Sequence, residues 1–294
     1  MDPLHLVGRA QAPLMEEQWK QLDEAVVKAA RRVLVGRKVL PIYNLADVGV
    51  MEVQWDKESD LSPARISMYG ETPAEDILVY TRKSLVVPIL HKDFRIHWRD
   101  IIASRRKGRP LDAANAESAA LVVAQLEDEL ILTGEYSGSP KLGIEGLATA
   151  TGRNTVASVG AWATSPNAVN SVKNAMEELT VDKFYGPYDL ILQPGAFLDA
   201  HTFIGTTAVM QIDKIRELIG GKVHVTPALK AADGGTDSGL LMETGAENAD
   251  LCVAQDLKTF YMQLKDMNHF FKCYEAVVPR VKRPTAICEV TGIT

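Results

Sequence analysis

Apolar residues recur at helical spacing in two parts of the chain. Trp19, Leu22 and Val26 follow one another at intervals of three or four within residues 13–35, a pattern typical of an amphipathic helix with one buried face. Residues 111–133 form the longest helical stretch, with neither Gly nor Pro in it. Because about twenty helical residues span roughly 30 Å, this second segment is expected to be the spine of the fold.

A different pattern occupies residues 50–80. Met51 and Val53 alternate with polar residues, and Ile66 and Met68 do the same after an intervening polar loop. Such alternation predicts a long hairpin whose two faces differ. A long hairpin has little core of its own, so it is expected to lean on something else, such as a neighbouring subunit.

Short apolar runs and helical segments alternate through the rest of the chain, which predicts an α+β lobe. Helical patterns cover 166–179, 194–201 and 212–219. The β-like runs are 38–43, 188–192, 223–225, 239–243, 251–254, 259–264, 273–282 and 286–290.

Composition and charge narrow the class of protein. The formal net charge of −6 argues against nucleic-acid packaging, although residues 82–109 carry nine Lys/Arg against two Asp, a local balance of 9 − 2 = +7. The three cysteines are odd in number and far apart, which indicates free thiols rather than a disulfide framework or zinc ribbon. With no signal-peptide pattern and no apolar run long enough to span a bilayer, a cytoplasmic protein is expected.

The acidic run Glu127, Asp128 and Glu129 is the first candidate for chemistry. No His lies in residues 111–133, whereas di-iron helices need Glu-x-x-His pairs. Adjacent helical side chains also point in different directions. These acids are therefore expected to be solvated or salt-bridged, with a basic partner in 105–109 or on a neighbour.

No catalytic or metal-binding residues are predicted elsewhere. His91 and His97 have a spacing that suits neither a helix face nor a zinc motif. There is no G-x-S-x-G elbow and no Walker loop. A separate helix, a projecting hairpin and a spine helix instead indicate a self-assembling subunit.

An ordered series of motifs resembles the encapsulins, the prokaryotic nanocompartment shell proteins. The motifs are APLMEEQWKQLDEAVVKAARRVLVGRKVLPIY (12–43), KDFRIHWRDI, LEDELILTG, GIEGL, YGPYDLIL, GGKVHVTPAL and MNHFFKCYEAVVPRVKRPTAIC. The resemblance implies the α+β major-capsid fold of tailed phages, of the Hong Kong phage type. It further implies an N-terminal helix and arm (1–49), an extended hairpin loop (50–82), a peripheral domain with the spine helix (83–142 and 263–294) and an axial domain (143–262).

The resemblance also implies a function. Members of the family form an icosahedral homo-oligomeric shell around a cargo enzyme, which binds through a C-terminal targeting peptide, and the shell itself is no enzyme. The C-terminal motif looks most like encapsulins with ferritin-like, iron-storing cargo that protects against oxidative stress, with peroxidase cargo as the next choice. A viral or prophage major capsid protein is the alternative; the net charge of −6 favours the nanocompartment.

Site residues are carried over from the family onto matching positions. No cofactor is required, but some relatives bind a flavin, for which the candidate contacts are Trp98 and His91. The implied pore-lining residues are Ile204, Gly205, Thr206, Thr207, Ala208 and Gln211. The implied cargo-docking residues are Leu34, Arg37, Val39, Pro41, Ile42 and Tyr43. Independently of the family, an apolar β-like run next to an Arg suits an extended peptide.

Overall fold

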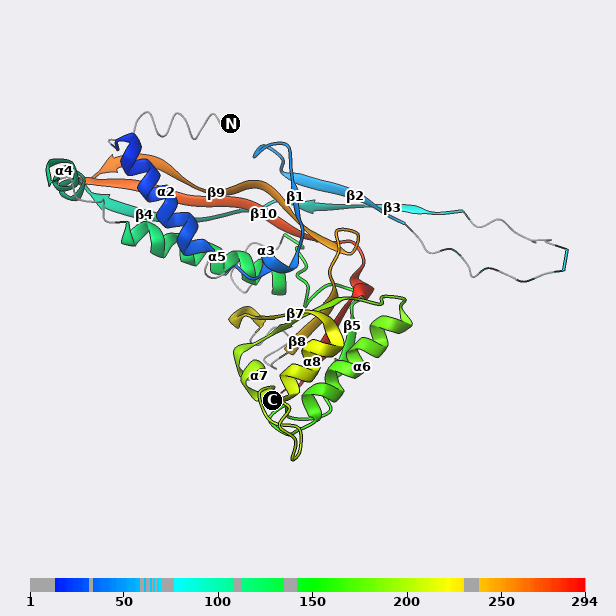
Figure 1. Ribbon diagram of the computed structural model, residues 1–294. Coiled ribbons are helices and arrows are strands. Elements are labelled where there is room, and N and C mark those ends of the chain that lie inside the picture. Colours follow the sequence, from blue (N-terminus) through cyan, green and yellow to red (C-terminus); the bar gives the residue numbers. More distant parts are fainter. Residues whose placement is uncertain are drawn as a thin grey trace.

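The chain folds into an elongated body and a compact lobe, with a hairpin that projects from the elongated body (Figure 1). The computed structural model describes residues 14–31, 34–58, 61, 64, 66, 68–69, 77–107, 113–134, 142–229 and 238–293. Helices and strands are mixed in both bodies, which confirms the expected α+β class.

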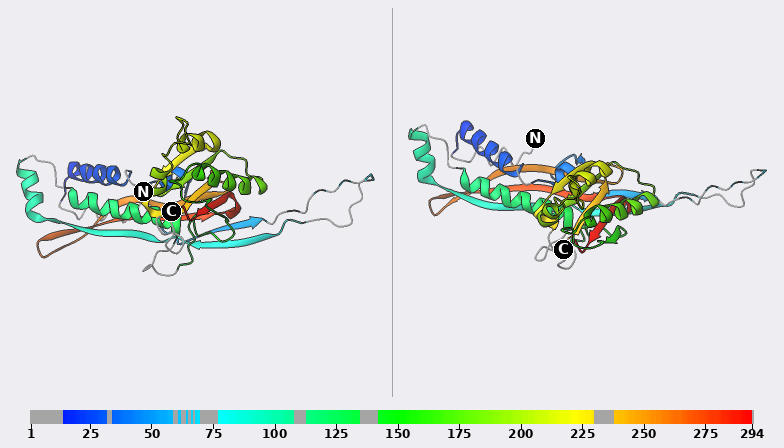
Figure 2. Two further views of the ribbon diagram at one scale, coloured as in Figure 1. Left: turned by 90° about the horizontal axis from the view of Figure 1, so that it is seen from below. Right: turned by 60° about the horizontal axis from the view of Figure 1, so that its bottom comes forward.

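The elongated body is built on a four-stranded sheet in the order β1-β9-β10-β4. Its strands are β1 (Ile42–Asn44), β4 (Ile89–His97), β9 (Ala249–Lys265) and β10 (Asn268–Val281). The long helix α5 (Ala114–Thr133) packs on β4 and β10, and α2 (Glu16–Ala30) packs on α5. Both helices therefore lie on one side of the sheet, as Figure 2 shows. Two shorter helices, α3 (Gly36–Val39) and α4 (Trp98–Lys107), complete this body.

The apolar stripe of α2 is buried as its periodicity predicts. Trp19, Leu22 and Val26 join one core cluster, and the Trp19 ring meets Phe271 of β10 edge-to-face at 5.9 Å. Both predicted long helices are present, although α2 ends at Ala30. Asp112, whose side chain is of a type that suits the N-cap of the second helix, lies outside the described residues.

The projecting hairpin consists of β2 (Glu52–Glu58) and β3 (Tyr80–Val86), paired from Glu52 with Val86 to Glu58 with Tyr80. The prediction of a hairpin is correct, but the expected return strand around Ile66 and Met68 is wrong. Both of those side chains are fully exposed. Two-residue alternation reports an extended backbone, but it does not identify which segment is the pairing partner.

The compact lobe contains a five-stranded sheet in the order β5-β11-β8-β6-β7. Helices α6 (Asn167–Val181) and α8 (Gln211–Ile219) pack against it and against each other. The strands are β5 (Asn154–Ala157), β6 (Tyr188–Leu192), β7 (Gly220–Val225), β8 (Ser238–Glu243) and β11 (Ile287–Thr291). The short elements are α7 (Pro194–Asp199) and the 3-10 turns Pro227–Leu229 and Pro284–Ala286.

The sheets divide the chain differently from the expected boundaries of 143–262 and 263–294. Strand β9 lies in the elongated sheet, although most of it was assigned to the axial domain. Strand β11, assigned to the peripheral domain, lies in the lobe between β5 and β8. The sheet that each strand joins is decided by pairing with strands far away in the sequence. Local sequence patterns carry no information on that pairing. Within the described segments, no helix combines the length and apolarity needed to cross a membrane.

Candidate functional site

The segment predicted to dock a peptide is half helical rather than uniformly extended. Gly36–Val39 forms the single turn α3, and only Ile42–Asn44 forms a strand. The Leu34 and Val39 side chains are buried. Ile42 and Tyr43, in contrast, are each 50% exposed, so they are the members of the predicted set that face outward most fully.

In the described part of the chain strand β1 has an open edge, because the sheet order places it at the end with β9 as its neighbour. On the β9 side, Leu251 N–H donates to Pro41 O at 2.9 Å and Leu45 N–H donates to Val253 O at 2.8 Å. Backbone groups alternate in a parallel ladder. Those of Ile42 and Asn44 therefore point to the open edge, where an extended peptide could add as a further strand.

Tyr43 rests on a rigid support. The Arg280 guanidinium lies 4.8 Å from the centre of the Tyr43 ring and is held by two hydrogen bonds to Asp250, of 2.8 and 2.6 Å. Burial alone would raise the pKa of Asp250, but hydrogen bonds from Arg280 and Lys282 outweigh it and lower that pKa. The ion pair therefore stays charged and keeps the Tyr43 ring in place.

Arg37 is directed inward, to what we call the charge cluster: Arg37, Glu127, Asp256 and Glu275. Its Nε donates to Glu127 Oε1 at 2.6 Å on α5, and its two terminal nitrogens donate to Asp256 Oδ1 of β9 at 2.7 Å and to Glu275 Oε2 of β10 at 3.1 Å. One guanidinium thus ties α3 to three other elements. The expectation that Arg37 contacts a docked peptide does not match this arrangement.

The acidic run on α5 is a structural junction. Asp128 accepts hydrogen bonds from the backbone N–H groups of Val35 and Gly36, both at 2.9 Å, and so caps α3. Glu127 and Asp128 are buried, which corrects the expectation of solvated acids, whereas the expected salt bridge is present on Glu127. The partner is Arg37 rather than the segment 105–109. Adjacent acids serve different partners, and in the described part of the chain no group of three His, Cys, Asp or Glu could hold a metal.

Burial perturbs both acids that lie deep in the charge cluster. Glu127 and Glu275 are each 1% exposed. Desolvation, followed by the charge of Glu127, raises the pKa of Glu275 to about 9. Desolvation also raises the pKa of Glu127, although the charge of Arg37 opposes it. Sequence reasoning missed Glu275, yet a signal was available: an acid inside the apolar strand CYEAVV needs a buried partner.

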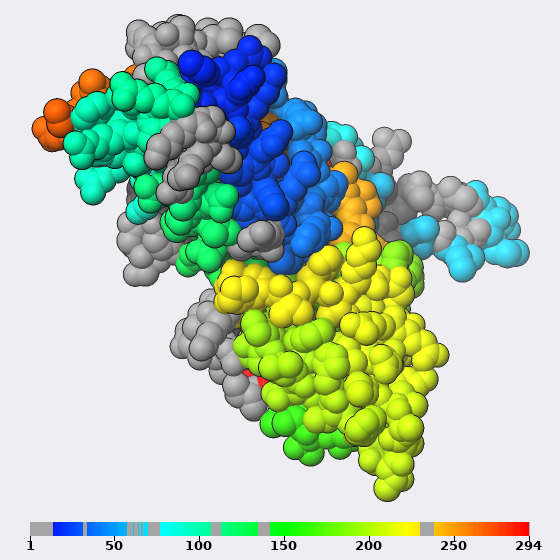
Figure 3. Space-filling model, turned by 60° about the vertical axis from the view of Figure 1, so that its left-hand side comes forward, coloured from blue at the N-terminus to red at the C-terminus, as the bar shows by residue number. Residues whose placement is uncertain are grey.

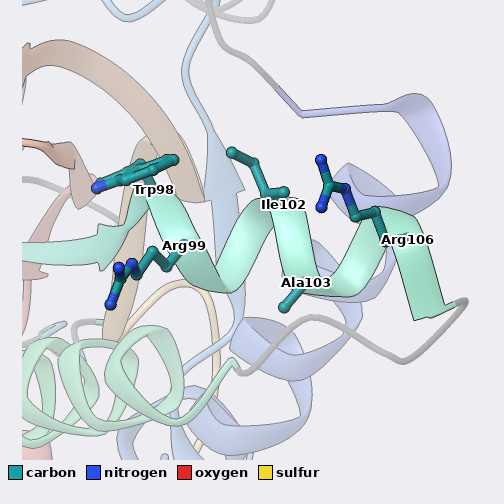
Figure 4. Close-up of a pocket in the computed structure, with 5 residues that line it drawn as sticks. All are labelled: Trp98, Arg99, Ile102, Ala103 and Arg106. Atoms are coloured by element: carbon teal, nitrogen blue, oxygen red, sulfur yellow. The ribbon is translucent and has the colours of Figure 1, made fainter.

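The candidate flavin contacts do not form one site in this chain. His91 and Trp98 are seven residues apart along β4 and the start of α4, which is roughly 20 Å in an extended strand. His91 instead lies beside Lys272, with their nitrogens 3.4 Å apart. Trp98 contributes to an open pocket of about 400 Å³ lined by Arg99, Ile102, Ala103 and Arg106. Figure 4 shows these side chains spread around α4 alone, which does not fit an enclosed flavin site within one subunit.

Five of the six predicted pore residues, 204–208, lie in the loop between α7 and α8, at the tip of the compact lobe (Figure 3). Its two ends meet in a bridge between Phe203 and Met210. The side of the loop that faces solvent includes four of the predicted residues: Gly205, Thr206, Thr207 and Ala208. Ile204 is partly buried.

Gln211 is wrong as a pore-lining residue, because it is 0% exposed. Its amide accepts from Ala168 N–H at 3.1 Å and donates to Trp162 O at 3.0 Å and to Thr202 Oγ1 at 2.6 Å. It anchors the loop from inside the lobe.

Comparison with known proteins relates this chain, over most of its length, to encapsulin shell proteins. A family model described as "Encapsulating protein for peroxidase" (Linocin_M18) matches residues 4–278. The type 1 encapsulin shell protein EncA of Myxococcus xanthus is 38% identical over 286 residues, 97% of this chain and 96% of that protein. A diheme-cytochrome–encapsulin shell fusion protein of Kuenenia stuttgartiensis is 33% identical over 273 residues, 93% of this chain and 72% of that protein.

Solved structures show the same fold at low sequence identity. A virus-like particle from Pyrococcus furiosus matches with a TM-score of 0.73 and 18% identity, over 94% of this chain and 100% of that one. The capsid of the Myoviridae phage XM1 matches with a TM-score of 0.68 and 12% identity, over 90% of each chain. The expected tailed-phage capsid fold is confirmed.

Proposed function

The chain belongs to the encapsulin family, and from this premise we propose that it closes into an icosahedral shell whose inner face holds a cargo enzyme. It is a shell protein that forms a nanocompartment, and its identity of 38% to a shell protein over nearly the whole chain is the observation that carries this function. The exposed hairpin β2–β3 supports assembly, because apolar side chains such as Met51 and Val86 are left uncovered in one subunit.

Negative-stain imaging of the purified protein tests the shell. Uniform hollow particles are expected, and their absorbance at 260 nm relative to 280 nm should be that of protein alone. A stable monomer or dimer at micromolar concentration would refute assembly. Particles filled with nuclease-protected DNA would favour the alternative function, a viral or prophage capsid protein. Phage capsid proteins resemble this chain in fold.

We place the docking of the cargo peptide at the open edge of β1. The half-exposed Ile42 side chain and the Tyr43 ring on its Arg280 support favour this location, as do the backbone groups of Ile42 and Asn44, which point away from β9 and have no partner strand among the described residues. A peptide strand added there would gain main-chain hydrogen bonds along the edge and apolar contact with alternate side chains. The sequence-based set thus narrows to Ile42 and Tyr43, because Leu34 and Val39 are buried in the core and Arg37 is engaged by the charge cluster.

Ile42→Asp tests this location. The new carboxylate would be buried without a partner once the peptide docks, which costs several kcal/mol and predicts at least a roughly tenfold loss of co-purifying cargo. Two matched controls should load normally: Ile42→Val keeps the apolar contact, and Val181→Asp puts the same charge on an exposed apolar position in the compact lobe. Unchanged loading in intact Ile42→Asp shells would show that cargo docks elsewhere.

The proposed cargo is a ferritin-like, iron-oxidising enzyme, on the resemblance of the C-terminal segment MNHFF…RVKRPTAIC to shells with such cargo. A peroxidase is the alternative, since the matching family model is described by that cargo. Mass spectrometry of native particles identifies the cargo protein, and the form of the bound iron distinguishes a ferritin-like enzyme from a peroxidase. Iron without haem absorbance is expected, whereas a haem Soret band would favour the peroxidase or a cytochrome.

A further inference from the structure

Arg37 faces more buried negative charge than it can neutralise. Glu127 and Glu275 are both buried to 1% exposure, whereas Asp256, the third partner, is exposed and solvated. If both buried acids were ionised, two carboxylates would share one cation in a medium where unpaired charge is costly. Further titratable groups that act on this site or on its neighbours include Lys38 of α3, Asp128 of α5, Cys273 of β10 and Asp23 of α2.

These neighbouring groups do not restore the balance. Asp128 adds a further negative charge, and it is already engaged by the backbone of α3. The pKa of Cys273 is raised to about 12 by burial and then by the charges of Glu275 and Asp23, so this thiol is neutral. Lys38 is exposed to solvent.

Two orphan oxygen atoms show where the imbalance lies. Arg37 binds Oε1 of Glu127 and Oε2 of Glu275. The remaining oxygens, Glu127 Oε2 and Glu275 Oε1, are buried and have no partner among the described residues. The two side chains lie within hydrogen-bonding reach of each other. Two ionised carboxylates are both acceptors, but a proton on one of them makes it a donor to the other.

We infer that Glu127 and Glu275 hold one proton between them at neutral pH, and that this proton fastens α3 and β1 to the spine helix. We call α3 and β1, residues 36–44, the arm. The arm lies over the pair because Arg37 reaches both acids from α3. When the arm lifts, water reaches the pair, both acids ionise as ordinary carboxyl groups, and one proton is released to solvent.

The pH dependence follows from this release. Burial, and then the charge of Glu127, raises the pKa of Glu275 to about 9, whereas an exposed Glu titrates near 4.3. The proton's contribution to the stability of the closed arm is therefore complete at low pH. It is lost progressively as the pH rises between these two values, and it changes no further above about pH 9. Opening of the arm should become about tenfold easier per pH unit in that window. This coupling of proton release to opening of the arm does not depend on whether cargo docks at β1.

Hydrogen exchange on assembled wild-type particles tests the inference between about pH 6 and pH 8.5. After correction for the intrinsic rate, protection of amides in residues 36–44 should fall about tenfold per pH unit. In Glu275→Gln, an amide donates permanently to Glu127 and the fall should disappear. The matched control Glu129→Gln, from the same acidic run but outside the charge cluster, should keep the wild-type fall. A pH-independent wild type, or a Glu275→Gln protein with the same fall, overturns the inference.

Infrared spectroscopy supplies a readout that a purely structural role would not move. Wild-type particles at about pH 7.5 should show the carbonyl stretch of a protonated carboxyl group, and Glu275→Gln should lack it. Absence of this band from the wild type overturns the inference. If Glu275→Gln does not assemble, the wild-type band and the wild-type exchange profile decide the question.

Discussion

Replacing Arg37 with methionine would remove the cation bonded to Glu127 and Glu275 while keeping a side chain of similar length. Of the three partners of Arg37, Asp256 is exposed, and an ion pair with an exposed acid is worth only about 0–1 kcal/mol. The two buried acids dominate, because breaking a buried pair by removing one partner costs about 3–5 kcal/mol. At about 2–4 °C per kcal/mol for a chain of this size, the melting temperature should fall by about 6–20 °C at pH 7.5.

The assay is thermal unfolding of particles at about pH 5 and pH 7.5. The deficit of Arg37→Met should shrink at pH 5, because a second proton on the Glu127–Glu275 pair removes the charge that Arg37 would have balanced. Arg216→Met is the matched control. Arg216 pairs with Asp213 at 3.8 Å on the exposed side of α8, away from the hairpin, and its loss should leave the melting temperature of the particles unchanged.

Two results would refute this reasoning. If Arg37→Met particles melt at the same temperature as Arg216→Met particles at pH 7.5, the buried ion pairs contribute nothing net to stability. If the deficit of Arg37→Met instead grows as the pH falls, the two acids do not carry the charge that the argument assigns to them.

Two further substitutions test close packing and the pore loop. In Gly146→Ala, the new Cβ would lie 2.6 Å from the backbone carbonyl carbons of Leu132 and Thr133 and closer still to Gly134 N. Because backbone cannot move aside, a loss of about 1–3 kcal/mol is expected, measured by denaturant unfolding against Gly49→Ala, whose new Cβ would make only an ordinary contact with Asp47 Oδ2 at 3.8 Å. Gln211→Leu leaves buried polar groups without partners, which costs about 1–3 kcal/mol. It should accelerate hydrogen exchange in residues 202–210 while the hairpin β2–β3 exchanges as in the wild type.

Periodicity predicted those elements whose residues bury one face against the core. The helix expected at 111–133 is α5 (Ala114–Thr133), and the apolar run Tyr188–Leu192 is the fully buried strand β6. The return strand of the hairpin could not be found in this way. β3 is exposed at nearly every position, so burial imposes no alternation on its sequence. What fixes its place is pairing with β2, which no local window contains.

The acidic run shows a different limit of sequence reasoning. Helical geometry correctly separated the directions of Glu127 and Asp128, but it could not name Arg37, which lies 90 residues earlier in the chain. A partner at that distance follows from tertiary structure alone. The signal that was present was Glu275 in an apolar strand, since a buried acid requires a partner or a proton.

Directional contacts explain why charged residues occupy this junction. The arm contains a four-residue helix and a three-residue strand, too short to bury enough apolar surface to select one position. Apolar residues in place of the cluster could stabilise the junction as well or better, but hydrophobic contact is non-directional and would permit several positions of the arm. Hydrogen bonds from one guanidinium to α5, β9 and β10 have defined geometry. Together with the cap at Asp128, they hold β1 in register with β9 and keep its open edge in one place on the subunit.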